Sequence, residues 1–189
     1  MTQAKFLSIR DICSIAIFTA LIAALSPLSI PTPVGVSITL SSFVVPFAAV
    51  VLGAKRGTIA AIAYILLGAM GLPIFSNFAG GASMLIGPTG GFLFGFPLYA
   101  FLAGWGADRD RWFWLAGSLS LGVTLFFAMG MLQFSFVTGN TLAASFTMVV
   151  LTFVPTEIIK LVLVWVLGRH VRARLTQSGL LAIHSPTRR

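Results

Sequence analysis

Long apolar runs alternate with short polar interruptions along the chain, and this pattern predicts its elements. The runs favour six helices, at Asp11–Leu25, Phe43–Leu52, Thr58–Met70, Phe92–Trp105, Trp112–Phe134 and from Pro155 into Arg169–Arg174. A helix needs about 20 mostly apolar residues to cross a bilayer, where no water satisfies an open backbone. The pattern therefore predicts an all-α, polytopic integral membrane protein with six transmembrane helices.

The start of the last helix depends on Pro155. The apolar segment Ala143–Leu167 is longer than one span requires, and proline disrupts a helix interior. Proline is tolerated in a first turn, so we expect a short piece before Pro155 and the sixth helix beginning there. Glu157 and Lys160 would then lie in its first two turns, toward the outer leaflet.

Two longer stretches, Ser26–Ser42 and Gly71–Gly91, break the pattern. Both are rich in proline and glycine, and neither carries a charge. Proline removes backbone donors that lipid cannot replace, so these stretches must lie at the surface or line a cavity.

Composition agrees with a membrane protein. Of the 189 residues, 58% are hydrophobic and only 8% are charged, with a mean hydropathy of +1.02, whereas soluble domains carry about 25% charged residues. The net charge of +8 does not indicate a nucleic-acid partner, because the basic residues flank apolar runs. Cys13 is the single cysteine, so the sequence predicts no intrachain disulfide and no cysteine metal site. We expect neither a metal nor a cofactor.

The amino terminus has features of a signal peptide. Lys5 and Arg10 precede an apolar run from Ile12, and small residues follow it. Because several further apolar spans come after it, we interpret this segment as an uncleaved first helix.

The distribution of Lys and Arg predicts the orientation. With the amino terminus inside, six helices place the Lys55-Arg56 and Arg109/Arg111 connectors and the basic tail in the cytoplasm. We therefore expect a multi-pass plasma-membrane protein with both termini cytoplasmic. Residues 1–174 would form one six-helix substrate-binding domain, and residues 175–189 a disordered basic cytoplasmic tail.

Glu157 and Lys160 are the only charged residues inside a long apolar context. A charge at membrane depth costs about 2.5–3.5 kcal/mol on insertion scales. Residues three apart share one helix face, so the two side chains can share one pocket. We interpret the pair as a binding site; the alternative is an ion pair that only orients the last helix.

Other candidates gain weight from their expected position near this pair. Asn77 is a common turn former, but its loop lies on the same predicted face. Gln133 is a weaker candidate, since polar residues often bridge helices. Phe75, Phe78 and Phe92 would supply apolar walls for a ligand.

The sequence gives little support for a catalytic function. The run Gly87–Gly91 lacks the lysine of a phosphate loop. Glu157 is the only carboxylate of the apolar region, which contains no histidine, so we assign no catalytic residue. An enzyme with Lys160 as base for a serine stays as a third alternative.

Ala16, Ala20 and Ala24 form a strip of small residues along the first helix. Such strips let another helix approach closely. The strip predicts either a docking face for a partner or a packing seam within the chain.

Four segments resemble the BioY family, the biotin-specific substrate-binding (S) components of energy-coupling factor (ECF) transporters. They are Pro31–Leu40, Gly68–Phe75, Gly87–Phe96 and Pro155–Lys160. The resemblance implies an S-component-like fold of six helices that captures biotin from outside, with no enzymatic activity. It also implies docking, through the small-residue face of the first helix, onto a transmembrane coupling protein with two ATPases.

The resemblance assigns ligand binding to Glu157, Lys160 and Asn77. The family usually has aspartate at the position of Glu157, glycine at that of Thr156 and tyrosine at that of Phe92. Biotin offers two ureido N–H donors, a carbonyl and a carboxylate, which these side chains can accept from or donate to. An S component for another vitamin is the second alternative. Whether the chain transports alone, as a homo-oligomer or only with ATPases is left open.

Overall fold

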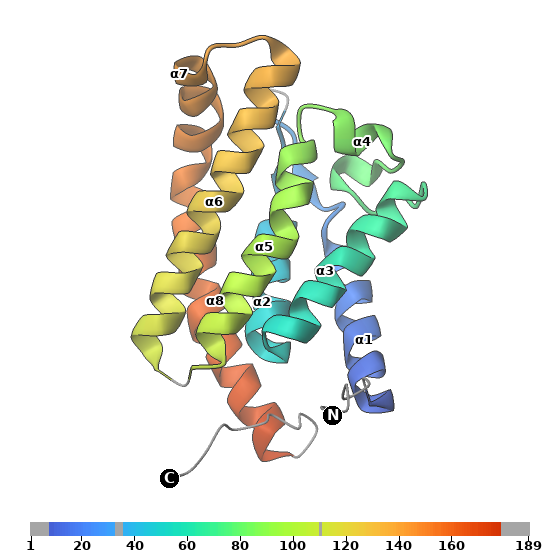
Figure 1. Ribbon diagram of the computed structural model, residues 1–189, viewed down its shortest axis with the longest axis vertical. Coiled ribbons are helices and arrows are strands. Elements are labelled where there is room, and N and C mark those ends of the chain that lie inside the picture. Colours follow the sequence, from blue (N-terminus) through green and yellow to red (C-terminus); the bar gives the residue numbers. More distant parts are fainter. Residues whose placement is uncertain (1–7, 33–35, 110, 179–189) are drawn as a thin grey trace, which may run out of the picture.

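Six long helical segments form the protein in the computed structural model, which describes residues 8–32, 36–109 and 111–178 (Figure 1). The segments are α1 (Ile9–Leu25), α2 (Ser41–Leu52), α3 (Ala54–Ala69), α5 (Gly90–Ala107), α6 (Trp112–Thr138) and the run of α7 (Leu142–Ser145), η2 (Phe146–Leu151) and α8 (Thr152–Gln177). They coincide with the six predicted apolar runs, so the all-α prediction is confirmed.

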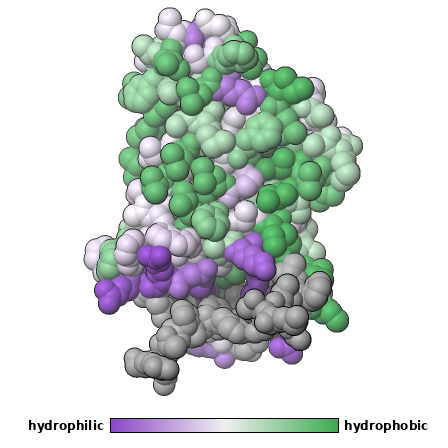
Figure 2. Space-filling view, in the orientation of Figure 1, coloured by the Kyte–Doolittle hydropathy of each residue, from purple (hydrophilic) through white to green (hydrophobic). Residues whose placement is uncertain are grey.

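Three helices of the described chain are long and apolar enough to cross a membrane. They are α5, α6 and the continuous run Leu142–Gln177, while α2 is a shorter apolar helix. Large apolar side chains such as Phe101 and Leu121 point outward, and Figure 2 shows apolar residues over most of the visible body. Soluble proteins rarely expose contiguous apolar surface of this extent, so the exterior fits a lipid environment.

Small residues let α2, α3 and α5 pack closely against one another. A side chain at Gly104 of α5 would collide with the backbone of Gly53 and Ala54, and one at Gly57 of α3 with Ala49 of α2. Close backbone approach of this kind is the usual basis of helix packing in membranes.

The prediction that Pro155 divides the last segment is wrong. The helix continues through it from Leu142 to Gln177, with a π-helical turn at Phe146–Leu151 directly before α8. Proline clashes with the carbonyl four residues earlier, here Leu151, and that carbonyl belongs to the widened π turn. Glu157 and Lys160 consequently lie near the middle of a 36-residue run, not in the first two turns.

Other boundaries differ less. Lys55 and Arg56 lie in the first turn of α3 and not in a connector, because Gly53 alone separates α2 from α3, with a φ of 88° that favours glycine. Helix α8 extends to Gln177, past residue 175 where the tail was predicted to begin. Residues 179–189 of that tail lie outside the described residues.

The two predicted irregular stretches contain short elements. The first holds the antiparallel strands β1 (Ser29–Ile30) and β2 (Ile38–Thr39), in which Ser29 pairs with Thr39. The second holds the 3₁₀ turn η1 (Ser76–Phe78) and α4 (Ser83–Ile86). The start of α1 and the end of α8 lie together at the opposite end of the bundle from α4 and α7 (Figure 1).

Candidate ligand-binding site

A pocket lies between the helices and the two loop stretches. Its aromatic walls are Tyr64, Phe75, Phe92, Phe96, Phe126, Phe127 and Phe153. Its polar lining is Ser37, Thr39, Ser41, Ser42, Ser76, Thr89 and Glu157. The pocket offers about 60 Å³ to the centres of water-sized molecules, which is room for several of them. A ligand with an apolar body and a few polar groups suits such a lining.

Glycines of α3 and α6 leave room for the rings of the predicted wall residues Phe75 and Phe92. The ring of Phe75 lies against Gly68 and meets Tyr64 edge-on, with centroids 5.5 Å apart. The ring of Phe92 lies against Gly130. No side chain fits at either glycine, so the glycines determine where these two rings stand.

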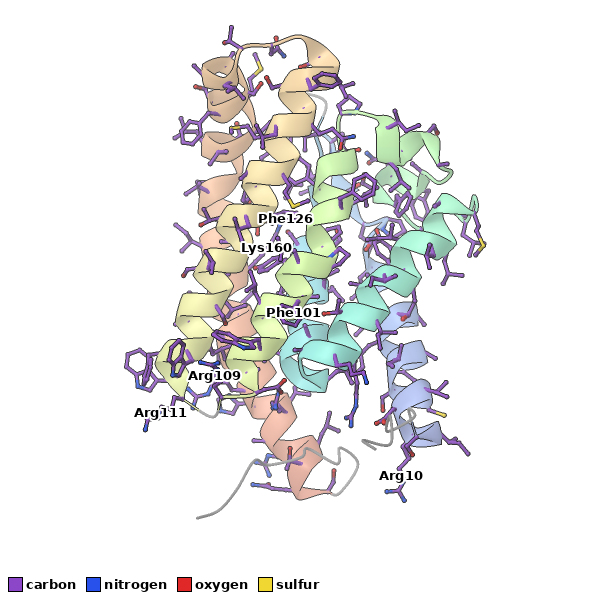
Figure 3. The ribbon with its side chains drawn as sticks, in the orientation of Figure 1. Arg10, Phe101, Arg109, Arg111, Phe126 and Lys160 are labelled. Atoms are coloured by element: carbon purple, nitrogen blue, oxygen red, sulfur yellow. The ribbon has the colours of Figure 1, made fainter. Side chains whose placement is uncertain are left out.

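The predicted pair forms at the polar end of the pocket. Lys160 Nζ donates to Glu157 Oε1 at 2.7 Å, to Ser42 Oγ at 2.9 Å and to the Thr39 carbonyl at 2.9 Å. An ammonium has three N–H donors, so these three acceptors satisfy it completely. Figure 3 shows Lys160 at the centre of the bundle, at the level of Phe126.

Ser42 is a site residue that the sequence analysis missed. Its hydroxyl accepts from Lys160 and donates to Glu157 Oε1 at 2.7 Å, and its side chain is buried. It stands in the first turn of α2, where the apolar pattern placed the end of a loop. The adjacent polar residues Ser41-Ser42, directly before an apolar run, were the only local signal.

Glu157 is left with one unsatisfied oxygen. Its side chain is 6% exposed, and Oε2 is buried without a hydrogen-bond partner among the described residues. A buried carboxylate oxygen without a donor is costly, and such groups are uncommon in folded proteins. Because Glu157 lines the pocket, a ligand donor there would complete its hydrogen bonding.

Asn77 and Phe78 do not line the aromatic pocket. Together with Ser29, Thr39 and Lys160 they line a second, more open groove. Thr39 borders both the groove and the pocket, and Lys160 reaches the carboxylate of Glu157 from the groove side.

Asn77 joins the two loop stretches. Its Nδ2 donates to Ser37 Oγ and its Oδ1 accepts from Ser29 Oγ, both at 2.8 Å. The residue has a left-handed backbone with a φ of 56°, which asparagine tolerates better than most residues. Phe78 is 67% exposed, so it forms no enclosed wall.

Gln133 lines neither cavity. Its Nε2 donates to the carbonyls of Leu85 and Gly87, at 2.8 and 2.9 Å. It thereby attaches α6 to the turn before α5, which carries Phe92.

The strip of Ala16, Ala20 and Ala24 is exposed on α1. The opposite face of this helix carries Ile15, Thr19 and Ile22, which are buried in the bundle. The strip therefore does not pack within the described chain. Across the described residues, no group of three His, Cys, Asp or Glu side chains could hold a metal ion.

Comparison with known proteins gives concordant matches. Residues 1–177 match the BioY family. The chain is 47% identical to the biotin transporter BioY of Thermotoga maritima over 128 residues, which cover 67% of this chain and 75% of that protein. It is 36% identical to the biotin transporter BioY of Rhizobium etli over 182 residues, covering 87% and 94%.

A solved structure is similar along nearly the whole length. The crystal structure of the S-component for biotin from an ECF-type ABC transporter superposes with a TM-score of 0.81 at 30% identity. The similarity covers 92% of this chain and 95% of that one.

Proposed function

The chain belongs to the BioY family, and we propose that it is a membrane-embedded subunit that binds biotin for uptake. The relatives named above are biotin transporters and a biotin S-component. The alternatives of an enzyme and of an S component for another vitamin are not favoured.

The unsatisfied Oε2 of Glu157 is the observation that supports biotin as the ligand of this pocket. Biotin's ureido ring presents N–H donors, and a carboxylate held at one oxygen and open at the other accepts them. Hydrogen bonds to a charged acceptor are stronger than neutral ones. The aromatic walls would enclose the fused ring of biotin.

Lys160 and Asn77 act, in this proposal, where the open groove meets the pocket. Lys160 fixes Oε1 of Glu157 through the 2.7 Å contact and so leaves Oε2 available to the ligand. Asn77 ties Ser29 and Ser37 of the first loop stretch to η1. A ligand whose ring lies in the pocket would extend its polar tail toward these donors.

Equilibrium titration of the purified chain with biotin tests the proposal. We expect saturable binding of biotin, with no binding of thiamine or riboflavin under the same conditions. Glu157→Gln should weaken biotin binding by about 10- to 150-fold, because a charged acceptor is worth about 1.5–3 kcal/mol. Equal affinity for an unrelated vitamin, or wild-type affinity in folded Glu157→Gln, would overturn the assignment.

Uptake against a gradient requires an energy source outside this chain. The sequence contains no G-x-x-x-x-G-K-[ST] phosphate loop. We propose a transmembrane coupling protein with two ATPases as partners, docking on the exposed strip of Ala16, Ala20 and Ala24. Large side chains there would prevent another helix from approaching.

The variant Ala20→Trp tests this docking face. It should abolish co-purification with the coupling module and uptake, while the purified chain binds biotin as before. Ala143→Trp, at an exposed alanine of α7, is the matched control and should leave both intact. Normal co-purification of Ala20→Trp would place the interface elsewhere.

The orientation belongs to the same proposal. Hydrophilic residues gather near the end of the bundle where α1 begins and α8 ends (Figure 2). Arg10, Arg109 and Arg111 lie at that end (Figure 3), and basic residues favour the cytoplasmic side. We therefore place both termini in the cytoplasm of a plasma-membrane protein. In a Cys13→Ala background, an impermeant reagent should label a cysteine at Gly80 in intact cells and not one at Arg109.

A further inference from the structure

A third cavity lies at the end of the bundle where α1 begins and α8 ends (Figure 1), separate from the aromatic pocket and from the groove beside Asn77. It is a groove of about 1100 Å³ between the α5–α6 connection and the last turns of α8. Four arginines line it: Arg109, Arg111, Arg169 and Arg172. Asp108 is the only carboxylate of the described lining. We call this cavity the arginine groove; Figure 3 shows Arg109 and Arg111 at its level.

The Asp108 carboxylate of the groove is already occupied. Asp108 Oδ1 accepts from Arg172 Nη2 at 2.7 Å and Oδ2 accepts from the Ala54 amide at 3.0 Å. Arg172 Nη1 donates in addition to the Val50 carbonyl at 2.8 Å. Arg172 therefore serves to attach α8 to α2 and to the end of α5, and it neutralises the charge of Asp108.

Arg109, Arg111 and Arg169 form no ion pair with a carboxylate among the described residues, which do not include Asp110. The Arg109 guanidinium stacks on Trp105 at 3.7 Å and on Trp114 at 4.7 Å, and Arg169 lies 5.4 Å over Trp165. Stacking uses the face of a guanidinium and leaves its N–H edge available. Such an edge matches the oxygens of a phosphate group in a bidentate geometry.

The surroundings of the groove are those of a membrane interface. Trp112 and Trp114, at the start of α6, line it and are 62% and 40% exposed. Tryptophan is enriched at the headgroup level of membranes. Beyond it, Leu121 of α6 and Leu163 of α8 point outward from the apolar body. The groove thus has donors for an anion beside surface for acyl chains.

We propose that the arginine groove binds the phosphate headgroup of an anionic phospholipid, whose acyl chains lie along α6 and α8. Basic pockets between transmembrane helices on the cytoplasmic side bind such headgroups. A docking protein would need complementary acidic side chains but would not account for exposed tryptophans beside an apolar flank. The proposal is independent of biotin binding, because the groove and the aromatic pocket share no lining residue.

Lipid binding to the purified chain tests the proposal. Native mass spectrometry in detergent would compare phosphatidylglycerol with phosphatidylcholine. The double variant Arg109→Gln/Arg169→Gln should lose about 25-fold in affinity for phosphatidylglycerol, at about fivefold per arginine. The control Arg10→Gln/Arg174→Gln removes the same charge from exposed sites outside the groove lining, and should retain wild-type affinity.

Biotin titration and thermal unfolding of each variant check the fold. If the double variant unfolds, the single variant Arg111→Gln replaces it. Arg111 also lines the groove, and its guanidinium lies 5.8 Å from the ring centroid of Phe113. The affinity for phosphatidylglycerol should then fall about fivefold. Unchanged phosphatidylglycerol binding, or equal losses in groove and control variants, would overturn the proposal. Competition by inorganic phosphate as effective as that by lipid would instead indicate a free-anion site. Loss of co-purification with an ATPase module, with lipid binding intact, would make the groove a protein interface.

Discussion

Two ion pairs on α8 have the same length and different chemistry. Lys160 meets Glu157 at 2.7 Å in mid-helix, and Arg172 meets Asp108 at 2.7 Å near the terminal end. Asp108 uses both carboxylate oxygens within the protein, on Arg172 and on the Ala54 amide. Glu157 uses only Oε1 and leaves Oε2 buried without a described partner. The Asp108–Arg172 pair is complete within the protein and joins helices, whereas the Glu157–Lys160 pair has one buried oxygen that, in the proposed function, accepts from the ligand.

Burial increases this difference. The Asp108 side chain is 44% exposed, but the side chains of Glu157 and Lys160 are 6% and 12% exposed. Water screens the outer pair, so its net contribution to stability is small. The inner pair lies where a charge without its partner is costly. A change at the inner pair should therefore alter ligand binding far more than a change at the outer pair alters folding.

Lys160→Ala should have the largest effect. It removes the donor that fixes Oε1 and leaves a buried carboxylate without its cation. We expect biotin affinity to fall by about 2–5 kcal/mol, which is about 30- to 5000-fold. Calorimetric titration measures the biotin affinity. Lys160→Arg should also impair binding, because a planar guanidinium does not reproduce the three donor directions of an ammonium. Wild-type affinity in both folded variants would reduce the pair to a structural role like that of Asp108–Arg172.

Ser42→Ala should have an intermediate effect. Glu157 Oε1 and Lys160 would each lose one partner, at about 1–3 kcal/mol for an unsatisfied buried group. We expect roughly a 5- to 150-fold loss of biotin affinity. The control is Ser118→Ala, because Ser118 is also buried, donates to the Leu115 carbonyl at 3.1 Å and does not line the pocket. Equal losses in the two variants would contradict the role assigned to Ser42.

Asp108→Asn should have the smallest effect. The amide oxygen can still accept a hydrogen bond, while the partly exposed charge pair is lost. We expect a destabilisation of about 0.2–1 kcal/mol and unchanged biotin affinity, measured by thermal unfolding in detergent and by titration. A loss of biotin affinity as large as that of Ser42→Ala would show that the two ends of α8 are coupled.

Much of this protein follows from local sequence properties. Apolar periodicity and the cost of charges in lipid act along the chain, so the six helical runs and the family resemblance were predicted correctly. The i,i+3 spacing of Glu157 and Lys160 predicted a shared face for the same reason, and the contact is present. The strip of alanines on α1 was likewise visible, although only the structure shows that it faces outward.

Tertiary structure decided the rest. Ser42 reaches a carboxylate 115 residues away, and no local pattern reports such a contact. The π turn that lets α8 continue through Pro155 is a property of the folded helix, whereas propensity alone favoured a break. Packing of the two loop stretches against the helices placed Asn77 and Phe78 in the open groove and Phe75 and Phe92 in the pocket. Sequence patterns determined which segments are helices and which charges lie among them, because the cost of an open backbone or a charge in lipid depends on local sequence. Long-range packing determined which side chains meet.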